Sequence, residues 1–240
     1  MPRRDGRQPD QLRPLSFTLD APGLAAGRVL ASLGRTVVLC TCSVEWGVPE
    51  FLVGRGKGWL TAEYNMLPGS TSPRKARDRG GKIDGRGVEI QRLIGRSLRA
   101  VVNLDALGER TLWIDCDVLQ ADGGTRVTAI SGAFLAVVQV LKAAALPARA
   151  VLRDSVAAVS VGLWEGQAFL DLDYREDKDA DVDLNLVMTG SGQIVEVQAG
   201  GEEATFSTDH LDSLLKLGKA GIAQIAAAQR ASLSADWPLD

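Results

Sequence analysis

The clearest change of hydrophobic period in this chain lies between Leu112 and about Ala144. Apolar residues occupy every second position from Leu112 to Val118, which is the pattern of a β-strand with one buried face. After Gln120 the alternation ends in a short polar loop that contains two glycines. Beyond Arg126, small and apolar residues continue without a helix breaker. The stretch therefore predicts a strand, a tight turn and a mostly buried helix.

The first half of the chain contains further strand patterns and one helix pattern. Three strands are predicted, at residues 15–21, 35–47 and 59–64. Residues 27–34 are expected to form short pieces between glycine turns. Residues 88–102 predict a helix with an apolar face, made by Ile90, Leu93, Ile94 and Leu98. Residues 1–14 are polar and rich in proline and arginine, and we expect a frayed or surface-draped arm.

The second half predicts mainly antiparallel strands and ends in a helix. A Glu165-Gly166 turn joins two predicted strands, and Leu170 and Leu172 are expected to face away from Asp171 and Asp173. A charged loop at 175–180 leads into a strand at 181–189, and a further strand follows at 193–198. A helix is predicted from about Thr208 to Ala231, with Asp209 in its cap region and a loose tail behind it. This order of elements favours one α+β domain of two β-α layers.

Composition restricts the classes of function. The chain has 240 residues, 45% of them hydrophobic, and a formal net charge of −3, so a polyanionic ligand needs a local basic patch. The polar N-terminus predicts no signal peptide, and no apolar run is expected to reach the roughly 20 residues of a membrane span. We therefore expect a cytoplasmic protein that does not associate with a membrane. Three cysteines fit a reducing compartment as buried thiols, and a lone His210 disfavours Ser-His and Cys-His catalysis.

The turn before the predicted central helix is a candidate anion site. Gly123, Gly124 and Thr125 stand where a strand meets a helix N-terminus, whose unpaired N–H groups and positive dipole end attract anions. Thr125 adds a hydroxyl, and Arg126 adds a guanidinium suited to bidentate phosphate binding. The same residues also fit an ordinary strand-to-helix turn with a threonine cap. The spacing matches neither a P-loop nor a dinucleotide-binding fingerprint.

Basic residues gather between Arg74 and Arg86. The segment holds Arg74, Lys75, Arg77, Arg79, Lys82 and Arg86 against only two aspartates. One interpretation is a solvated charged loop. The other is a landing surface for a phosphodiester backbone, which an acidic protein requires if it is to hold RNA.

Acidic residues gather in the second half. Six of them lie between Asp173 and Asp183. Crowded carboxylates repel one another, and a divalent cation relieves that repulsion; a ligand set made only of oxygens suits Mg²⁺ or Mn²⁺. Asp177 in the predicted loop and Asp183 on the strand can converge on one ion. A solvated acidic hairpin is the alternative.

Taken together, these stretches resemble the ribonuclease PH family of bacterial phosphate-dependent 3′→5′ exoribonucleases. The matching stretches follow the family order over almost the whole chain: RRDGR at 3–7, VLCTCSVEWGVPEFL at 38–52, GKGWLTAEYNMLP at 56–68, EIQRLIGRSLRA at 89–100, DCDVLQADGGTR at 115–126, VAAVSVG at 156–162, ED at 176–177 with VDLNLVMT at 182–189, and IVEVQ at 194–198.

The resemblance implies a role for each candidate residue. Phosphate ligands map onto Arg86, Gly124, Thr125 and Arg126. The catalytic, metal-linked carboxylates map onto Asp177 and Asp183, and the RNA-contacting loop maps onto the segment with Arg74 and Arg77. It further implies a single ribonuclease PH domain over residues 1–240 and a homo-hexamer built as a trimer of dimers. Inorganic phosphate would be the co-substrate, and the 3′ ends of transfer RNA precursors the substrate.

Two other readings compete with this one. A non-catalytic RNA-binding subunit of an exosome-like ring has the same fold, but it does not need Arg126, Asp177 and Asp183 together. A small-molecule kinase on a related fold needs a glycine loop for ATP, and no such motif is found in the sequence.

Overall fold

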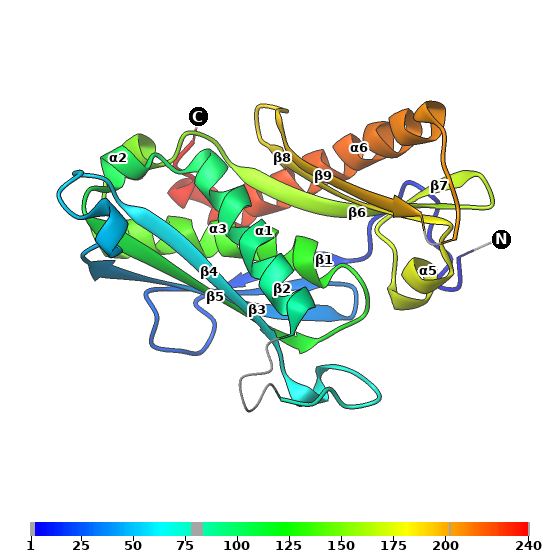
Figure 1. The fold of residues 1–240 in the computed structure, drawn as a ribbon, viewed down its shortest axis with the longest axis horizontal. Coiled ribbons are helices and arrows are strands. Elements are labelled where there is room, and N and C mark those ends of the chain that lie inside the picture. The colour runs from blue at the N-terminus through cyan, green and yellow to red at the C-terminus, as the bar shows by residue number, and fades with distance from the viewer. Residues whose placement is uncertain (1–2, 78–83, 202, 240) are drawn as a thin grey trace.

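The computed structural model describes residues 3–77, 84–201 and 203–239, which form two β-sheets with helices packed against them (Figure 1). The first sheet has the order β1-β2-β3-β5-β4, with β1 at Leu15–Leu19, β2 at Gly27–Leu33, β3 at Thr36–Trp46, β4 at Trp59–Met66 and β5 at Arg110–Gln120. The second has the order β7-β6-β8-β9, with β6 at Val156–Trp164, β7 at Gln167–Leu170, β8 at Val182–Thr189 and β9 at Ile194–Gly201. The predicted α+β fold class is confirmed.

Helix α1, Gly85–Val101, crosses from β4 to β5, the parallel pair of an otherwise antiparallel first sheet. Its predicted apolar face is confirmed, because Ile90, Leu93, Ile94 and Leu98 are all buried. The short helix α2, Leu104–Leu107, follows before the chain enters β5. This β-α-β unit places the first turn of α1 at the end of the sheet where β5 delivers the glycine turn.

Helix α3, Thr125–Ala143, is the central helix of the fold and packs against β2 and β3 of one sheet and β6 of the other. A side chain at Gly132 would lie 2.8 Å from Cys40 Sγ, so the glycine permits the close approach of helix and sheet. By length and hydropathy α3 could also cross a membrane, contrary to the sequence expectation, but 78% of its apolar window is buried inside the protein. A helix that is apolar all round is here the core helix between two sheets.

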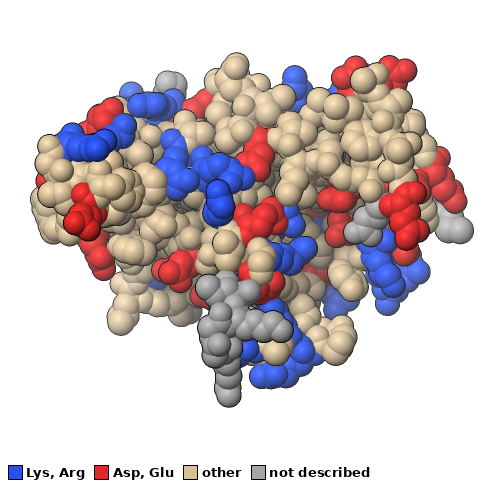
Figure 2. Space-filling view, in the orientation of Figure 1, with Lys and Arg blue, Asp and Glu red and all other residues tan. Residues whose placement is uncertain are grey.

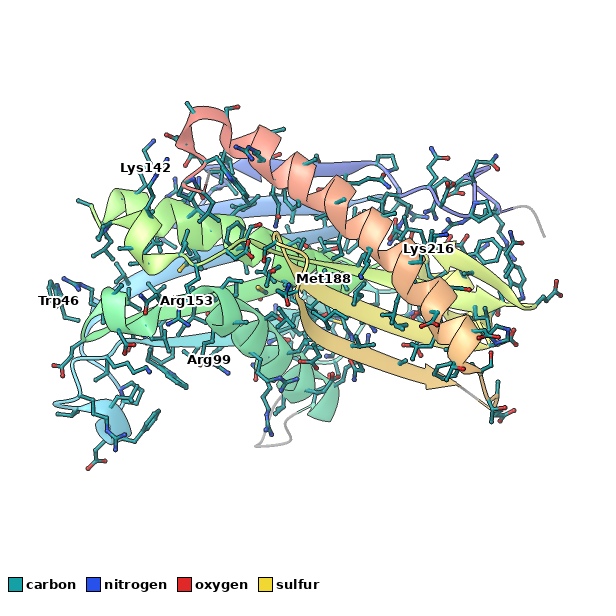
Figure 3. The ribbon with its side chains drawn as sticks, turned by 90° about the horizontal axis from the view of Figure 1, so that it is seen from above. Trp46, Arg99, Lys142, Arg153, Met188 and Lys216 are labelled. Atoms are coloured by element: carbon teal, nitrogen blue, oxygen red, sulfur yellow. The ribbon has the colours of Figure 1, made fainter. Side chains whose placement is uncertain are left out.

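Helix α6, Thr208–Leu233, lies along the second sheet, as the view from above shows (Figure 3). The helix begins at Thr208, as expected, and ends two residues later than expected. Ser207, rather than Asp209, is its N-cap and accepts a hydrogen bond from the backbone N–H of His210 at 3.2 Å. The remaining short helices are α4, Ala148–Val151, and α5, Tyr174–Asp179, and three 3-10 turns cover Glu50–Leu52, Pro68–Ser70 and Ser234–Asp236.

Three local predictions were wrong, each because of a neighbour distant in sequence or an unrecognised cap. Residues 27–33 form one strand, and Gly27 is there because a side chain would lie 2.0 Å from the carbonyl oxygen of Ala136. Most of the predicted loop at 175–180 is helix α5, which a capping box between Asp173 and Glu176 initiates. The tail is not loose, since the Trp237 ring packs at 6.0 Å against Phe134 of α3.

The N-terminal arm is not draped over the surface either. The side chains of Arg3, Arg7 and Arg13 are buried, with 5%, 9% and 5% of each residue exposed. All three contact Asp171, Arg3 only at its backbone carbonyl; Asp171 is fully buried and has a positive φ of 55°. The expected opposition of Asp171 to Leu170 and Leu172 does not separate a buried from an exposed face, because all three residues are buried. A carboxylate can be buried there because the arm brings two guanidinium groups to it.

Candidate active site

The turn between β5 and α3 has the backbone geometry of an anion site. Gly123 and Gly124 are left-handed, with φ of 74° and 68°, a conformation that glycine adopts without steric cost. Gly124 is the N-cap of α3 and makes no side-chain cap hydrogen bond. The threonine-cap alternative is therefore wrong, because Thr125 is the first helical residue. Successive left-handed turn residues and a helix N-terminus direct N–H groups toward one point.

The hydroxyl of Thr125 accepts a hydrogen bond from Tyr64. The buried Tyr64 hydroxyl donates to Thr125 Oγ1 at 2.9 Å. Burial raises the pKa of Tyr64, although the Thr125 hydrogen bond and the charges of Arg86 and Arg126 oppose that rise. Tyr64 is thus a neutral donor, and Thr125 keeps its own hydrogen for an acceptor above the turn.

The two candidate phosphate-binding arginines come from two helix starts. Arg126 is the second residue of α3, and its Nη1 donates to Gln198 of β9 at 2.8 Å and to Glu89 of α1 at 3.2 Å. Arg86 is the second residue of α1, and its backbone N–H donates to the N-cap Asp84 at 3.1 Å. The first turns of α1 and α3 therefore bring two arginines to the same region.

The two candidate carboxylates come from the second sheet layer. Asp177 lies on α5, where its backbone N–H donates to the carbonyl of Asp173 at 2.8 Å. Asp183 lies on β8, and its register partners on both neighbouring strands are glycines, Gly162 and Gly200. Small neighbours on both sides leave the Asp183 carboxylate room at the sheet surface.

All six of these residues line one cavity of about 160 Å³ between the two layers. Its lining consists of Arg86, Gly124, Thr125, Arg126, Ser160, Asp177, Ala180, Asp183 and Asn185. Figure 1 shows α5 at the end of the second sheet, on the side of the β5–α3 turn. The structure thus brings together residues that are up to 97 positions apart, from Arg86 to Asp183.

Three other members of the acidic cluster serve the fold instead. Asp173 caps α5, and Glu176 binds Arg3 through both carboxylate oxygens, at 2.7 and 2.6 Å. Asp181 accepts from the backbone N–H of Glu165 at 2.8 Å. In the part of the chain that the structure describes, no group of three or more His, Cys, Asp or Glu side chains could hold a metal ion.

Ser160 and Asn185 line the cavity but were not among the predicted site residues. They are direct partners across β6 and β8. Ser160 Oγ is buried and has no hydrogen-bond partner among the described residues, so a ligand in the cavity would satisfy it. The sequence carried a signal for Asn185, because it shares a strand face with Asp183. It carried none for Ser160, which sits in an apolar strand.

The donor set fits a hard divalent cation. Asp177 and Asp183 supply carboxylate oxygens, Asn185 an amide oxygen and Ser160 a hydroxyl, all at the same cavity. Mg²⁺ requires only one or two protein carboxylates, because it retains several waters and binds substrate phosphate oxygens.

A second cavity of about 430 Å³ adjoins the first and shares Arg86, Gly124, Thr125 and Asp177 with it. Its outer wall includes the segment Thr71–Pro73, which leads directly into the basic loop. Arg74 and Arg77 are exposed there and do not line either cavity. Basic atoms lie at the lower edge of the molecule, where this segment projects (Figure 2). Arg79 and Lys82 lie outside the described residues.

The sequence matches the two domain models of one known protein family over most of its length. Residues 11–141 match the model of the 3′ exoribonuclease family, domain 1, and residues 154–221 match domain 2 of the same family. The chain therefore belongs to the 3′ exoribonuclease family.

Individual relatives agree with that assignment. The chain is 57% identical over 235 residues to ribonuclease PH of Rhodopirellula baltica, covering 95% of this chain and 96% of the relative. It is 52% identical over 242 residues to ribonuclease PH of Bacillus subtilis, covering 98% of both chains.

Solved structures share the fold at much lower identity. Rice Rrp46 superposes with a TM-score of 0.80 and 22% identity, covering 96% of this chain and 99% of that one. A chain of the Archaeoglobus fulgidus exosome with RNA bound to the active site superposes with a TM-score of 0.79 and 19% identity, covering 94% and 91%.

Proposed function

We propose a division of labour within the active site of this chain, which is a phosphate-dependent 3′→5′ exoribonuclease. An oxygen of inorganic phosphate attacks the phosphorus of the last phosphodiester of an RNA. The bond to the 3′ oxygen of the preceding nucleotide breaks, and a nucleoside diphosphate leaves. The observation that carries the proposal is the single cavity in which two helix-borne arginines and a glycine turn face two carboxylates.

The residues at the start of α1 and at the turn between β5 and α3 bind and orient the attacking phosphate. Free phosphate carries a charge of about −1.5 to −2 near neutral pH. Arg86 and Arg126 offset that charge, the N–H groups at Gly124 and Thr125 bind its oxygens, and the Thr125 hydroxyl donates one more hydrogen bond. A fixed phosphate makes the attack effectively unimolecular, which is a large part of the rate enhancement.

The residues of helix α5 and the second sheet act on the scissile phosphodiester and on the leaving oxygen. Asp177 and Asp183, with Asn185 and Ser160 beside them, would hold Mg²⁺ or Mn²⁺. When bound, such an ion offsets charge on the phosphodiester and stabilises the leaving 3′ oxygen. The chain needs no covalent nucleophile, because phosphate itself attacks.

The test is Arg126→Ala in an assay of oligonucleotide shortening at varied phosphate concentration. We expect a higher phosphate KM and a lower kcat, since the guanidinium both binds and orients the nucleophile. Arg92→Ala, at an exposed position of α1, is the matched control and should leave both constants unchanged. Nucleoside monophosphates formed at an undiminished rate in phosphate-free buffer would mean hydrolysis and would contradict the role given to Arg126.

We also propose that the chain assembles as a homo-hexamer, a trimer of dimers, and trims the 3′ ends of transfer RNA precursors. The aromatic end of the first sheet supports an assembly: Trp46, Phe51 and Val53 are 82%, 58% and 66% exposed. Trp46 points away from the body of the protein (Figure 3). Apolar side chains exposed together mark protein interfaces. A ring also collects several basic loops around one opening, which raises the positive field for RNA.

Light scattering tests the assembly. We expect six times the protomer mass of 25.5 kDa. A stable monomer that is fully active on structured RNA would contradict it.

The three free, buried cysteines, Cys40, Cys42 and Cys116, support our proposal that the protein works in the reducing cytoplasm.

A non-catalytic ring subunit is the rival function. It is disfavoured because such a subunit has no need to retain two arginines and two carboxylates around one cavity.

A further inference from the structure

Arg13, from the N-terminal arm, lies beneath the active site and contacts both of its layers. It is 5% exposed, and its backbone N–H, Nε and Nη2 all donate to the carboxylate of the fully buried Asp171, at 2.8, 2.9 and 2.6 Å. Arg7 Nη1 adds a contact to the same carboxylate at 3.4 Å. The buried charges are thus paired and hydrogen-bonded, which is the condition for keeping them out of water.

The rest of the Arg13 guanidinium binds backbone carbonyls on both sides of the active site. Nη1 donates to the carbonyl of Asp122, and Nη2 reaches the carbonyl of Gly123 at 3.4 Å; both belong to the turn that begins the phosphate site. Nη2 also donates at 3.2 Å to the carbonyl of Leu172, which leads into helix α5 and Asp177. One planar group therefore fixes the two segments relative to each other.

The two segments are in direct contact at Gly123. A Cβ at this position would lie 2.6 Å from the carbonyl oxygen of Leu172 and 2.7 Å from the carbonyl carbon of Asp173. Two contacts therefore set the spacing between the β5–α3 turn and the segment that leads into α5. One is the close packing of Gly123 against Leu172 and Asp173, and the other is the set of hydrogen bonds from the Arg13 guanidinium.

Arg3 makes a contrasting contact. It binds Glu176 through two hydrogen bonds and the carbonyls of Leu170 and Asp171 at 2.9 and 2.7 Å. Glu176 immediately precedes Asp177 on α5. Arg3 thus holds only the carboxylate side of the site, whereas Arg13 spans both sides.

We propose that Arg13 is a positioning residue that sets the distance and angle between the bound phosphate and the carboxylates, so that phosphate is aligned for attack. The inference rests on the proposed function, which places phosphate at Gly124–Arg126 and the metal-binding carboxylates at Asp177 and Asp183. Arg13 touches no reacting atom. It acts through the carbonyls of Asp122, Gly123 and Leu172.

Arg13→Lys is the first test, because lysine keeps the charge near Asp171 but cannot reproduce the planar fork. At a temperature where circular dichroism shows an intact fold, we expect kcat to fall on the order of 10²-fold and the phosphate KM to rise about tenfold, as a misplaced nucleophile predicts. The KM for a short oligonucleotide should stay within about twofold.

Two control variants separate positioning from general destabilisation. Arg28→Lys removes a fork that binds the carbonyl of Ala21 far from the site and should leave the phosphate KM unchanged. Arg3→Lys should raise the Mg²⁺ concentration needed for activity without changing the phosphate KM. If Arg13→Lys leaves the phosphate KM unchanged, or if all three variants change it equally, the inference is wrong.

Gly123→Ala tests the same spacing without touching Arg13, and it replaces the first test if Arg13→Lys does not fold. The added Cβ must push the turn away from Leu172, so the kinetic changes should match those of Arg13→Lys. Gly166→Ala is the matched control, because Gly166 has nearly the same φ, 75°, but nothing lies within 4 Å of its Cβ position. Equal effects of the two glycine variants would contradict the inference.

Arg126→Ala, measured in parallel, separates this inference from the proposed function. If Arg126→Ala leaves the phosphate KM unchanged, the phosphate site itself is misassigned. If Arg126→Ala raises it and Arg13→Lys does not, the phosphate site stands and only the positioning role of Arg13 fails.

Discussion

Two arginine-rich segments of similar composition have opposite environments in this protein. The arm at residues 3–13 buries three guanidinium groups against Asp171, Glu176 and backbone carbonyls. The loop that begins at Arg74 leaves Arg74 and Arg77 exposed, and its Lys75 forms an ion pair with Asp84 at 2.7 Å. Charge content alone therefore does not reveal whether a basic segment binds a ligand or supports the fold. The environment of a basic segment depends on whether the fold places carboxylates against it.

The acidic residues show the same contrast over a short stretch of sequence. Asp171 is fully buried and serves the arm, whereas Asp177 and Asp183 line the cavity with Arg86 and Arg126. A buried carboxylate surrounded by guanidinium groups stabilises the fold. A carboxylate at a cavity shared with arginines and a helix N-terminus is available for chemistry.

The largest effect is expected at the buried pair. Asp171→Ala leaves the buried Arg13 guanidinium without its carboxylate partner, and the free energy of unfolding should fall by about 3–5 kcal/mol. Urea denaturation at fixed protomer concentration measures the change. Asp179→Ala, at an exposed position of α5, is the control and should change stability by about 0.5 kcal/mol or less. A loss at Asp171 no larger than that of the control would remove the distinction between the arm and the loop.

The next effect concerns the cavity carboxylates. Asp183→Asn keeps the size of the side chain but removes a charge, so kcat should fall on the order of 10²–10³-fold while the protein still binds RNA. Activity at increasing Mg²⁺ concentration should show weaker metal affinity. A variant with normal turnover would show that Asp183, like Asp171, serves only the fold.

A smaller effect is expected in the basic loop. Replacing both Arg74 and Arg77 by Ala should weaken RNA binding and reduce the salt slope by about 1.4, at about 0.7 per lost phosphate contact on a single strand. Turnover of a saturating short oligonucleotide should change less. Binding measured by fluorescence anisotropy at several salt concentrations gives the slope. An unchanged slope would mean that the exposed arginines do not contact RNA phosphates.

The smallest effect is expected where the loop joins α1. The hydrogen bond from Lys75, together with the N–H of Arg86, holds the pKa of Asp84 below its usual 3.8, although slight burial opposes this. Its stabilising contribution is present above about pH 3.8 and is lost as the pH falls through the lower folded-state pKa. Asp84→Asn keeps a capping side chain, so it should cost only about 0.2–1 kcal/mol at neutral pH. Urea titrations should show that difference vanish in acid.

Local sequence pattern was sufficient to predict the elements with a strong hydrophobic period and the turn between β5 and α3. The alternation at Leu112–Val118 and the apolar run after Arg126 specify a strand and a core helix, and a glycine pair between them leaves few backbone alternatives. The family-like motifs pointed to Arg86, Gly124, Thr125, Arg126, Asp177 and Asp183, and the structure places all six at one cavity. Local pattern suffices where the period of burial follows the period of the backbone.

Which charged side chains are buried and which line the cavity depends on contacts between residues distant in sequence. Gly27 was expected to mark a turn. The feature that requires glycine there is the carbonyl of Ala136 on α3, which leaves no room for a side chain and lies more than a hundred residues away in sequence. The arm with Arg13 was expected on the surface for the same reason, since Arg13 and Asp171 are each buried only because the other reaches it across 158 positions. Pairing two charges removes a desolvation cost that neither can avoid alone, and no local pattern records such a pair.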